Sequence, residues 1–218
     1  MKCYNCRKDL KPKENNREHI PAANLFAGFD NSTKDKIITV PACFECNNTY
    51  SPTDEEFRNM LGIINNKIEN KFITEKTVRS FLRKESSVKR LNLNDKGEVA
   101  AVEFSEKTLI DYHTKNFKGL YYHEYNQPLP LDYEIVVNTN ENDWSNETLA
   151  IISYLKDNFK WKKSSNENVF KYIIQPFREN LINPEKEDLI LKTDEPLIIC
   201  MMIYNNLHGA LVFGIKYK

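Results

Sequence analysis

The apolar positions of this chain repeat with two periods, and each period predicts one kind of element. A spacing of three or four residues, typical of a helix with one buried face, recurs in four segments: 51–68, 74–90, 105–122 and 147–159. In the first segment the apolar stripe consists of Phe57, Leu61, Ile64 and Ile68. We expect four helices here, and one or two further helical turns at 47–50.

Short apolar runs between turn residues predict strands. They lie at 18–21, 37–40, 91–93, 99–104, 133–137, 169–175, 197–204 and 210–217. The last two are joined around Asn205, Asn206 and Gly209, so we expect them to pair antiparallel. Helices and strands in this mixed order predict an α+β fold.

The length of 218 residues allows one domain of ordinary size and a small module. We place the boundary near residue 60, so that 1–60 form the module and 61–218 form a mixed domain that ends in antiparallel strands. Segments 7–17 and 22–36 are polar or contain glycine, and we expect loops there.

The sequence Ser51-Pro52-Thr53-Asp54 has the pattern of a helix start. Ser51 is expected as the N-cap, Pro52 as the first helical residue, and Asp54 as the acidic partner of the cap. A metal-ligand role is the alternative for Asp54.

Charge changes the picture little, because 31 basic and 31 acidic residues give a formal net charge of zero. Any surface for a polyanion must therefore be local. The one clearly basic segment, 74–90, is either a solvated helix face or a phosphate-binding surface. The first residues lack the apolar run of a signal peptide, and no stretch has the length of a membrane span. We expect a cytoplasmic protein with no membrane partner.

Four of the five cysteines form two Cys-x-x-Cys pairs, Cys3 with Cys6 and Cys43 with Cys46. In a reducing compartment such pairs bind metal more often than they form disulfides, and four thiolates complete a tetrahedral zinc site. We expect a structural Zn²⁺, with a redox or disulfide role as the alternative. Cys200 lies among Ile and Met residues and is expected to be a buried small hydrophobe.

Between the two pairs lies Glu18-His19-Ile20-Pro21, and Asn47 follows Cys46 directly. Pro21 favours an extended backbone at Ile20, so we expect a short strand on which Glu18 and His19 face opposite sides. The four thiols would then bring a carboxylate, an imidazole and a carboxamide together. A simpler alternative exists for each: a surface Glu, a hydrogen-bonded His and a helix-terminal Asn.

The order Cys-x-x-Cys, Glu-His-Ile-Pro, Cys-x-x-Cys-Asn resembles the zinc-stapled branch of the HNH endonucleases over about residues 1–54. The resemblance implies a ββα-metal fold, in which a hairpin and a helix surround one catalytic divalent ion. His19 matches the general base of the family, Glu18 the metal-binding acid, and Asn47 the helix residue that supplies another ligand. Carboxylate and carboxamide oxygens favour Mg²⁺ or Mn²⁺ as this ion.

The resemblance further implies hydrolysis of DNA phosphodiester bonds to 5′-phosphate and 3′-hydroxyl ends, with RNA as an alternative substrate. Small nucleases of this family with an appended domain often act in defence against phage or mobile DNA, and the resemblance suggests the same role for this chain. Residues 61–218 would then serve recognition, formation of a homodimer or binding of a regulatory protein.

Four residues are candidate nucleic-acid contacts, with solvated side chains as the alternative: Arg17, Asn48, Arg79 and Arg83. His113, His123 and His208 have no ligand spacing and are expected to be structural or exposed. The alternative function is a non-catalytic zinc ribbon that binds nucleic acid or protein, because such a module needs only the thiols.

Overall fold

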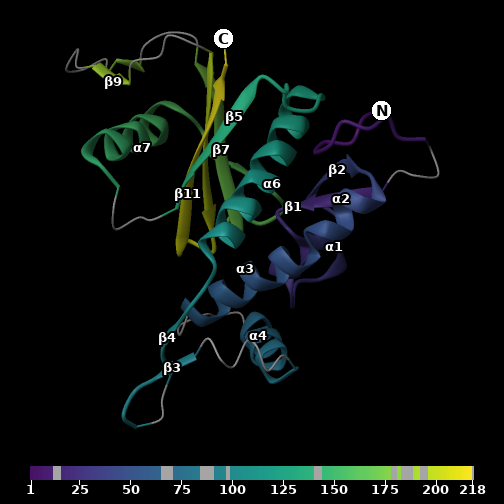
Figure 1. The fold of residues 1–218 in the computed structure, drawn as a ribbon, viewed down its shortest axis with the longest axis vertical. Coiled ribbons are helices and arrows are strands. Elements are labelled where there is room, and N and C mark those ends of the chain that lie inside the picture. The colour runs from purple at the N-terminus through teal and green to yellow at the C-terminus, as the bar shows by residue number, and fades with distance from the viewer. Residues whose placement is uncertain are drawn as a thin grey trace.

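A computed structural model describes residues 1–11, 16–64, 71–83, 91–96, 99–139, 144–177, 181–182, 189–191 and 196–217. It has the predicted α+β composition and ends in antiparallel strands (Figure 1). Within these residues no helix is both long and apolar enough to cross a membrane.

The largest element of the fold is a five-stranded antiparallel sheet in the order β5-β11-β10-β7-β6. Its strands are β5 (Tyr133–Asn138), β6 (Lys162–Lys163), β7 (Phe170–Phe177), β10 (Leu197–Tyr204) and β11 (His208–Lys216). As the sequence predicted, β10 and β11 pair antiparallel, and their register runs from Leu197 opposite Ile215 to Tyr204 opposite His208. Only the two-residue strand β6 was not predicted.

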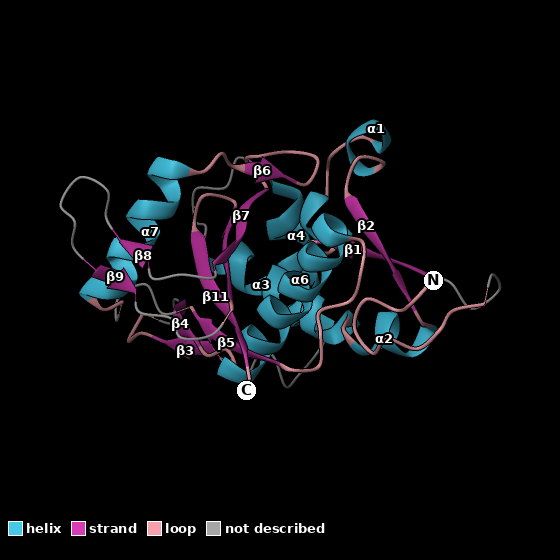
Figure 2. Cartoon of the chain, turned by 90° about the horizontal axis from the view of Figure 1, so that it is seen from above, coloured by secondary structure: helices cyan, strands magenta, loops and turns pink. Residues whose placement is uncertain are grey.

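One helix covers each face of this sheet (Figures 1 and 2). Along β10, Ile198, Cys200 and Met202 belong to a core shared with α6 (Glu106–Tyr125), whereas Ile199 and Met201 belong to a core shared with α7 (Asn146–Asn158). This alternation follows from the two-residue period of a strand. Cys200 is fully buried, in agreement with its predicted role as a small hydrophobe.

A separate hairpin and two helices make up the N-terminal part. The strands β1 (Asn16–Ile20) and β2 (Ile38–Ala42) pair antiparallel, with Glu18 opposite Val40 and His19 opposite Thr39. The helices α2 (Phe44–Thr49) and α3 (Ser51–Ile64) follow at once. The predicted boundary at residue 60 therefore lies within α3.

Helix α6 joins the N-terminal part to the sheet. It contacts β1, β2 and α3 as well as β5 and β11, so that one hydrophobic core contains residues from both parts of the chain. Helix α6 approaches strand β1 closely at Gly119, where an added Cβ would lie 2.4 Å from Cδ1 of Ile20. Glycine at this position is what allows α6 to lie directly on the hairpin.

The segment 22–36, predicted as a loop, contains two short helices, η1 (Ala23–Phe26) and α1 (Asn31–Lys34). Leu25 and Phe26 are fully buried, which explains why this connection is ordered into η1. The prediction missed it because one helical turn is too short to show a period.

Other differences concern the ends of elements. Helix α4 (Lys71–Arg83) begins three residues before the predicted 74, whereas Ile68 and the predicted continuation over 84–90 lie outside the described residues. The predicted hairpin is present as β3 (Leu91–Leu93) and β4 (Val99–Val102), and a further pair, β8 (Leu181–Ile182) and β9 (Leu189–Leu191), was not predicted.

Candidate metal centre and catalytic cluster

Each Cys-x-x-Cys pair forms a tight turn, called a knuckle here. The four knuckle cysteines, Cys3, Cys6, Cys43 and Cys46, come together as predicted. Their sulfur atoms all lie within 4.8 Å of one another, and Sγ of Cys6 is 3.7 Å from Sγ of Cys43. Four sulfurs at about 2.3 Å from a tetrahedral zinc ion would be about 3.8 Å apart. The cluster is therefore shaped to hold a metal ion such as zinc, and it ties the first residues of the chain to the start of α2.

Backbone N–H groups favour a thiolate at Cys3, whereas burial raises the pKa of Cys43 and of Cys46. The Cys43 N–H donates to Sγ of Cys3 and the Cys46 N–H donates to Sγ of Cys43, both at 3.4 Å. Burial raises the pKa of the Cys3 thiol, but the backbone N–H groups of Cys43, Cys6 and Asn5 outweigh it, and the net pKa is lowered. Cys6 is the exposed member of the set, so an ion would enter from its side.

Glu18 and His19 point to opposite faces of β1, as the sequence predicted. Glu18 is 4% exposed, whereas His19 is half-buried. Burial and, second, the charge of Lys115 lower the pKa of His19. The imidazole is therefore neutral at pH 7 and able to accept a proton.

Glu18 belongs to a buried ionic cluster that the sequence did not predict. The ammonium nitrogen of the fully buried Lys115 lies 2.9 Å from Oε1 of Glu18, and 2.7 and 2.8 Å from Oδ1 and Oδ2 of Asp54. It also lies over the ring of Tyr50, 5.7 Å from the ring centroid. The predicted capping role of Asp54 is therefore wrong: α3 begins at Ser51 itself, and both oxygens of Asp54 accept hydrogen bonds from Lys115.

The charges of this cluster do not cancel when both carboxyls are ionised, because two negative groups share one ammonium. Burial raises the pKa of Glu18 and of Asp54, and the charge of Lys115 acts in the opposite direction without cancelling that effect. The site is thus short of positive charge in its ionised state.

Two polar atoms beside this cluster lack partners. Oε2 of Glu18 and the hydroxyl of Tyr4 are buried and form no hydrogen bond within the described part of the chain. Burial raises the pKa of Tyr4 well above its usual value, and the nearby charge of Glu18 adds to this effect. Because a buried carboxylate oxygen without a partner is costly, Oε2 has the character of a ligand atom for a cation or a water molecule.

Asn47 lies on α2, which packs against β1, so the fold brings it to the element that carries Glu18 and His19. Its side chain is half-buried, and its carboxamide makes no hydrogen bond to any described residue. Its position within α2, after the N-cap residue Cys43, excludes the alternative of an N-terminal cap.

The four candidate nucleic-acid contacts are all exposed, but they lie on three different elements. Arg17 is on β1 and Asn48 is on α2. Arg79 and Arg83 are on α4, which packs against α3, and Arg79 forms an ion pair with Glu75 at 3.9 Å. The structure therefore places only Arg17 and Asn48 on elements of the predicted catalytic module.

The sequence did not predict a role for Lys115, because the resemblance that indicated the catalytic residues covers only about residues 1–54. A signal was present: Lys115 and Asn116 interrupt the apolar stripe of α6 between Tyr112 and Gly119, and a charge in such a place requires a buried partner. Nor did the sequence predict the pairing of His113 with His208, whose Nε2 atoms are 3.0 Å apart.

The fold and the site define an α+β protein with a cluster of four cysteines that could hold a metal ion, beside a buried Glu–Lys–Asp cluster. Comparison with protein-family models, with curated proteins and with solved structures found no match to this chain.

Proposed function

We propose that this chain is a metal-dependent nuclease that hydrolyses phosphodiester bonds of DNA. The observation that supports it most is the buried, unpartnered Oε2 of Glu18, next in the strand to a neutral histidine, on a hairpin fixed by four cysteines.

The residues present suit a divalent ion. Glu18 offers a free carboxylate oxygen and Asn47 a carboxamide that is not used elsewhere in the described chain. Glu18 and Asn47 would hold Mg²⁺ or Mn²⁺, which, when bound, stabilises negative charge on phosphate and leaving-group oxygens.

His19 would act as the general base. Its neutral imidazole accepts a proton from a water molecule as the oxygen of that water forms a bond to phosphorus. The bond from phosphorus to the 3′ oxygen breaks, and this oxygen takes a proton from solvent. The products are a 5′-phosphate and a 3′-hydroxyl, and the lowered pKa of His19 keeps the base available at neutral pH.

One observation favours a second candidate function, a non-catalytic module that is held together by a metal ion and binds nucleic acid or protein. Lys115 already binds Oε1 of Glu18 and both oxygens of Asp54, so these carboxylates also have a purely structural use. In this case Glu18 stabilises the contact between the hairpin and α6 and takes no part in chemistry.

Plasmid cleavage distinguishes the two. Purified protein is incubated with supercoiled DNA in Mg²⁺ or Mn²⁺, and zinc content is measured in parallel. For the nuclease we expect nicking that His19→Ala abolishes without loss of zinc. His123→Ala, which changes an exposed histidine on α6, is the matched control and should cut normally.

If the wild-type protein cuts neither DNA nor RNA in either metal, or if His19→Ala cuts as well as the wild type, the nuclease proposal is wrong. A gel-shift measurement with the same nucleic acids then tests the binding-module alternative.

A further inference from the structure

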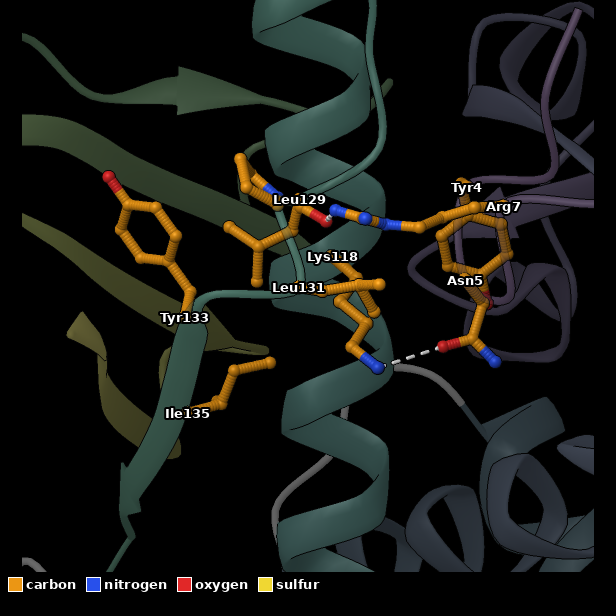
Figure 3. Close-up of a pocket in the computed structure, with 9 residues that line it drawn as sticks. Tyr4, Asn5, Arg7, Lys118, Leu129, Leu131, Tyr133 and Ile135 are labelled. Atoms are coloured by element: carbon orange, nitrogen blue, oxygen red, sulfur yellow. Dashed lines mark hydrogen bonds between the residues drawn. The ribbon is translucent and has the colours of Figure 1, made fainter. Parts of the chain in front are cut away.

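A cavity of about 190 Å³ lies between the first cysteine knuckle, α6 and the segment that leads into β5 (Figure 3). Tyr4, Asn5 and Arg7 come from the knuckle, Lys118 comes from α6, and the opposite wall contains Leu131 and Ile135. Pockets for drug-sized ligands begin at roughly 300 Å³. The cavity therefore suits a smaller compound.

Two cations line this cavity, and each binds a neutral acceptor. The guanidinium of Arg7 donates to the carbonyl of Leu129, and Nζ of Lys118 donates to Oδ1 of Asn5 at 3.0 Å. No carboxylate of the described residues forms an ion pair with either side chain. Lysine has three N–H donors and arginine five, so most of their donors remain available.

The position of Lys118 adds to this argument. Burial lowers its pKa, and the charge of Arg7 acts in the same direction, whereas Cys46 partly opposes both. An anion beside Lys118 and Arg7 would favour the charged form of the buried Lys118 ammonium. Leu131 and Ile135 give the opposite wall its apolar part, and Leu131 is 84% exposed, so the uncharged part of the same molecule would lie against them at the open side of the cavity.

We propose that this cavity binds a small organic oxyanion, a phosphate or carboxylate group on an apolar or planar body. Arg7 and Lys118 hold the anionic group, and the apolar wall holds the body. This proposal does not depend on nuclease activity, because none of its residues belongs to the proposed catalytic set.

The cavity is linked to the metal centre through one side chain. Asn5 accepts from Lys118 at 3.0 Å and donates from Nδ2 to Sγ of Cys46 at 3.4 Å. An anion that fixes Lys118 therefore also fixes Asn5 against the thiolate, so occupancy of the cavity should slow the loss of metal from the four cysteines.

Calorimetric titration of the zinc-loaded chain of 218 residues tests the site. The probes are phenyl phosphate, benzoate, inorganic phosphate and benzyl alcohol, all at one ionic strength. We expect phenyl phosphate or benzoate to bind more tightly than inorganic phosphate, and benzyl alcohol not to bind. Lys118→Met should weaken binding by about tenfold or more, the effect of losing one charged hydrogen bond.

Two variants provide controls. Lys107→Met makes the same change at an exposed position of the same helix, where the lysine pairs with Asp111, and it should bind like the wild type. Lys118→Arg keeps the cation and should retain binding, even if Lys118→Met is unstable. The rate of zinc transfer to a chelator should fall when phenyl phosphate is present.

The proposal is overturned if neither phenyl phosphate nor benzoate binds, or if Lys118→Met and Lys107→Met bind equally. It is also overturned if Lys118→Met loses zinc while the wild type binds no anion, because the two cations would then serve only to balance the thiolate charge.

Discussion

The ammonium nitrogen of Lys115 lies 2.9 Å from Oε1 of Glu18, with 0% and 6% of the two side chains exposed. The same nitrogen binds Asp54, 61 residues away in sequence. A lysine from α6 thus stands at the centre of the site that the hairpin and α3 form. The N-terminal hairpin, α3 and α6 are consequently parts of one electrostatic unit.

Lys115→Met should destabilise the protein by about 3–5 kcal/mol, because removal of one partner leaves buried carboxylates without compensation. Lys107→Met, at an exposed ion pair on the same helix, should change the free energy of unfolding by no more than about 0.5 kcal/mol. Urea unfolding of both variants measures this difference. Equal stabilities of the two variants would mean that Lys115 is not buried against Glu18 and Asp54.

Removal of one knuckle thiol should remove the metal and with it part of the stability. Cys43→Ser is expected to lower bound zinc from one ion per chain to a small fraction and to lower the melting temperature. Cys200→Ala, which changes the cysteine buried in the sheet core, should retain one zinc ion per chain. Elemental analysis of both variants provides the measurement, and full zinc in Cys43→Ser would contradict the assignment.

Gly119→Ala should destabilise the protein by about 1–3 kcal/mol, because the new Cβ would lie 2.4 Å from Cδ1 of Ile20. If this contact is the cause, Ile20→Ala and Gly119→Ala should be less destabilising together than the sum of the single changes. Thermal unfolding of the double-mutant cycle tests this. Additive effects would show that α6 does not lie directly on the hairpin.

Stability should fall as the pH decreases from 7 to 5. Burial lowers the pKa of His208 to about 4, and it lowers that of His113 as well, whereas an unfolded histidine has a pKa near 6.5. Between these values the unfolded chain binds more protons, so stability is fully present above pH 6.5 and is lost toward pH 4. His208 alone accounts for about 2 kcal/mol of this loss between pH 7 and pH 5.

His208→Gln keeps a hydrogen-bonding group beside His113 and removes the titration. Its free energy of unfolding, followed by urea denaturation, should depend less on pH between 7 and 5 than that of the wild type. An unchanged pH dependence would indicate that His208 is solvated in the folded protein.

Under the proposed function, Asn47→Ala should weaken Mn²⁺ binding by about tenfold or more, the loss expected when a ligand oxygen is removed. Asn48→Ala changes the next residue of the same helix, which is exposed, and should leave Mn²⁺ affinity unchanged. Electron paramagnetic resonance of Mn²⁺ measures both without reference to cleavage. The opposite order of affinities would make Asn48 the ligand.

The sequence by itself determined the local features of this protein. The longer helices and strands follow from the hydrophobic period, although η1, α1, β6, β8 and β9 do not, and the opposed directions of Glu18 and His19 follow from the geometry of one strand. The cysteine cluster was predictable because each Cys-x-x-Cys pair is a local turn and because four cysteines in two such pairs commonly bind one zinc ion.

Only the tertiary structure decided which residues meet around α6. The Lys115 bond to Glu18, the contact of His113 with His208 and the cationic cavity between Arg7 and Lys118 all depend on where α6 lies. Periodicity indicates that α6 has a buried face, but it does not say which partner covers that face. The close approach of Gly119 to Ile20 and the ion pairs of Lys115 with Glu18 and Asp54 are present only in the packed chain.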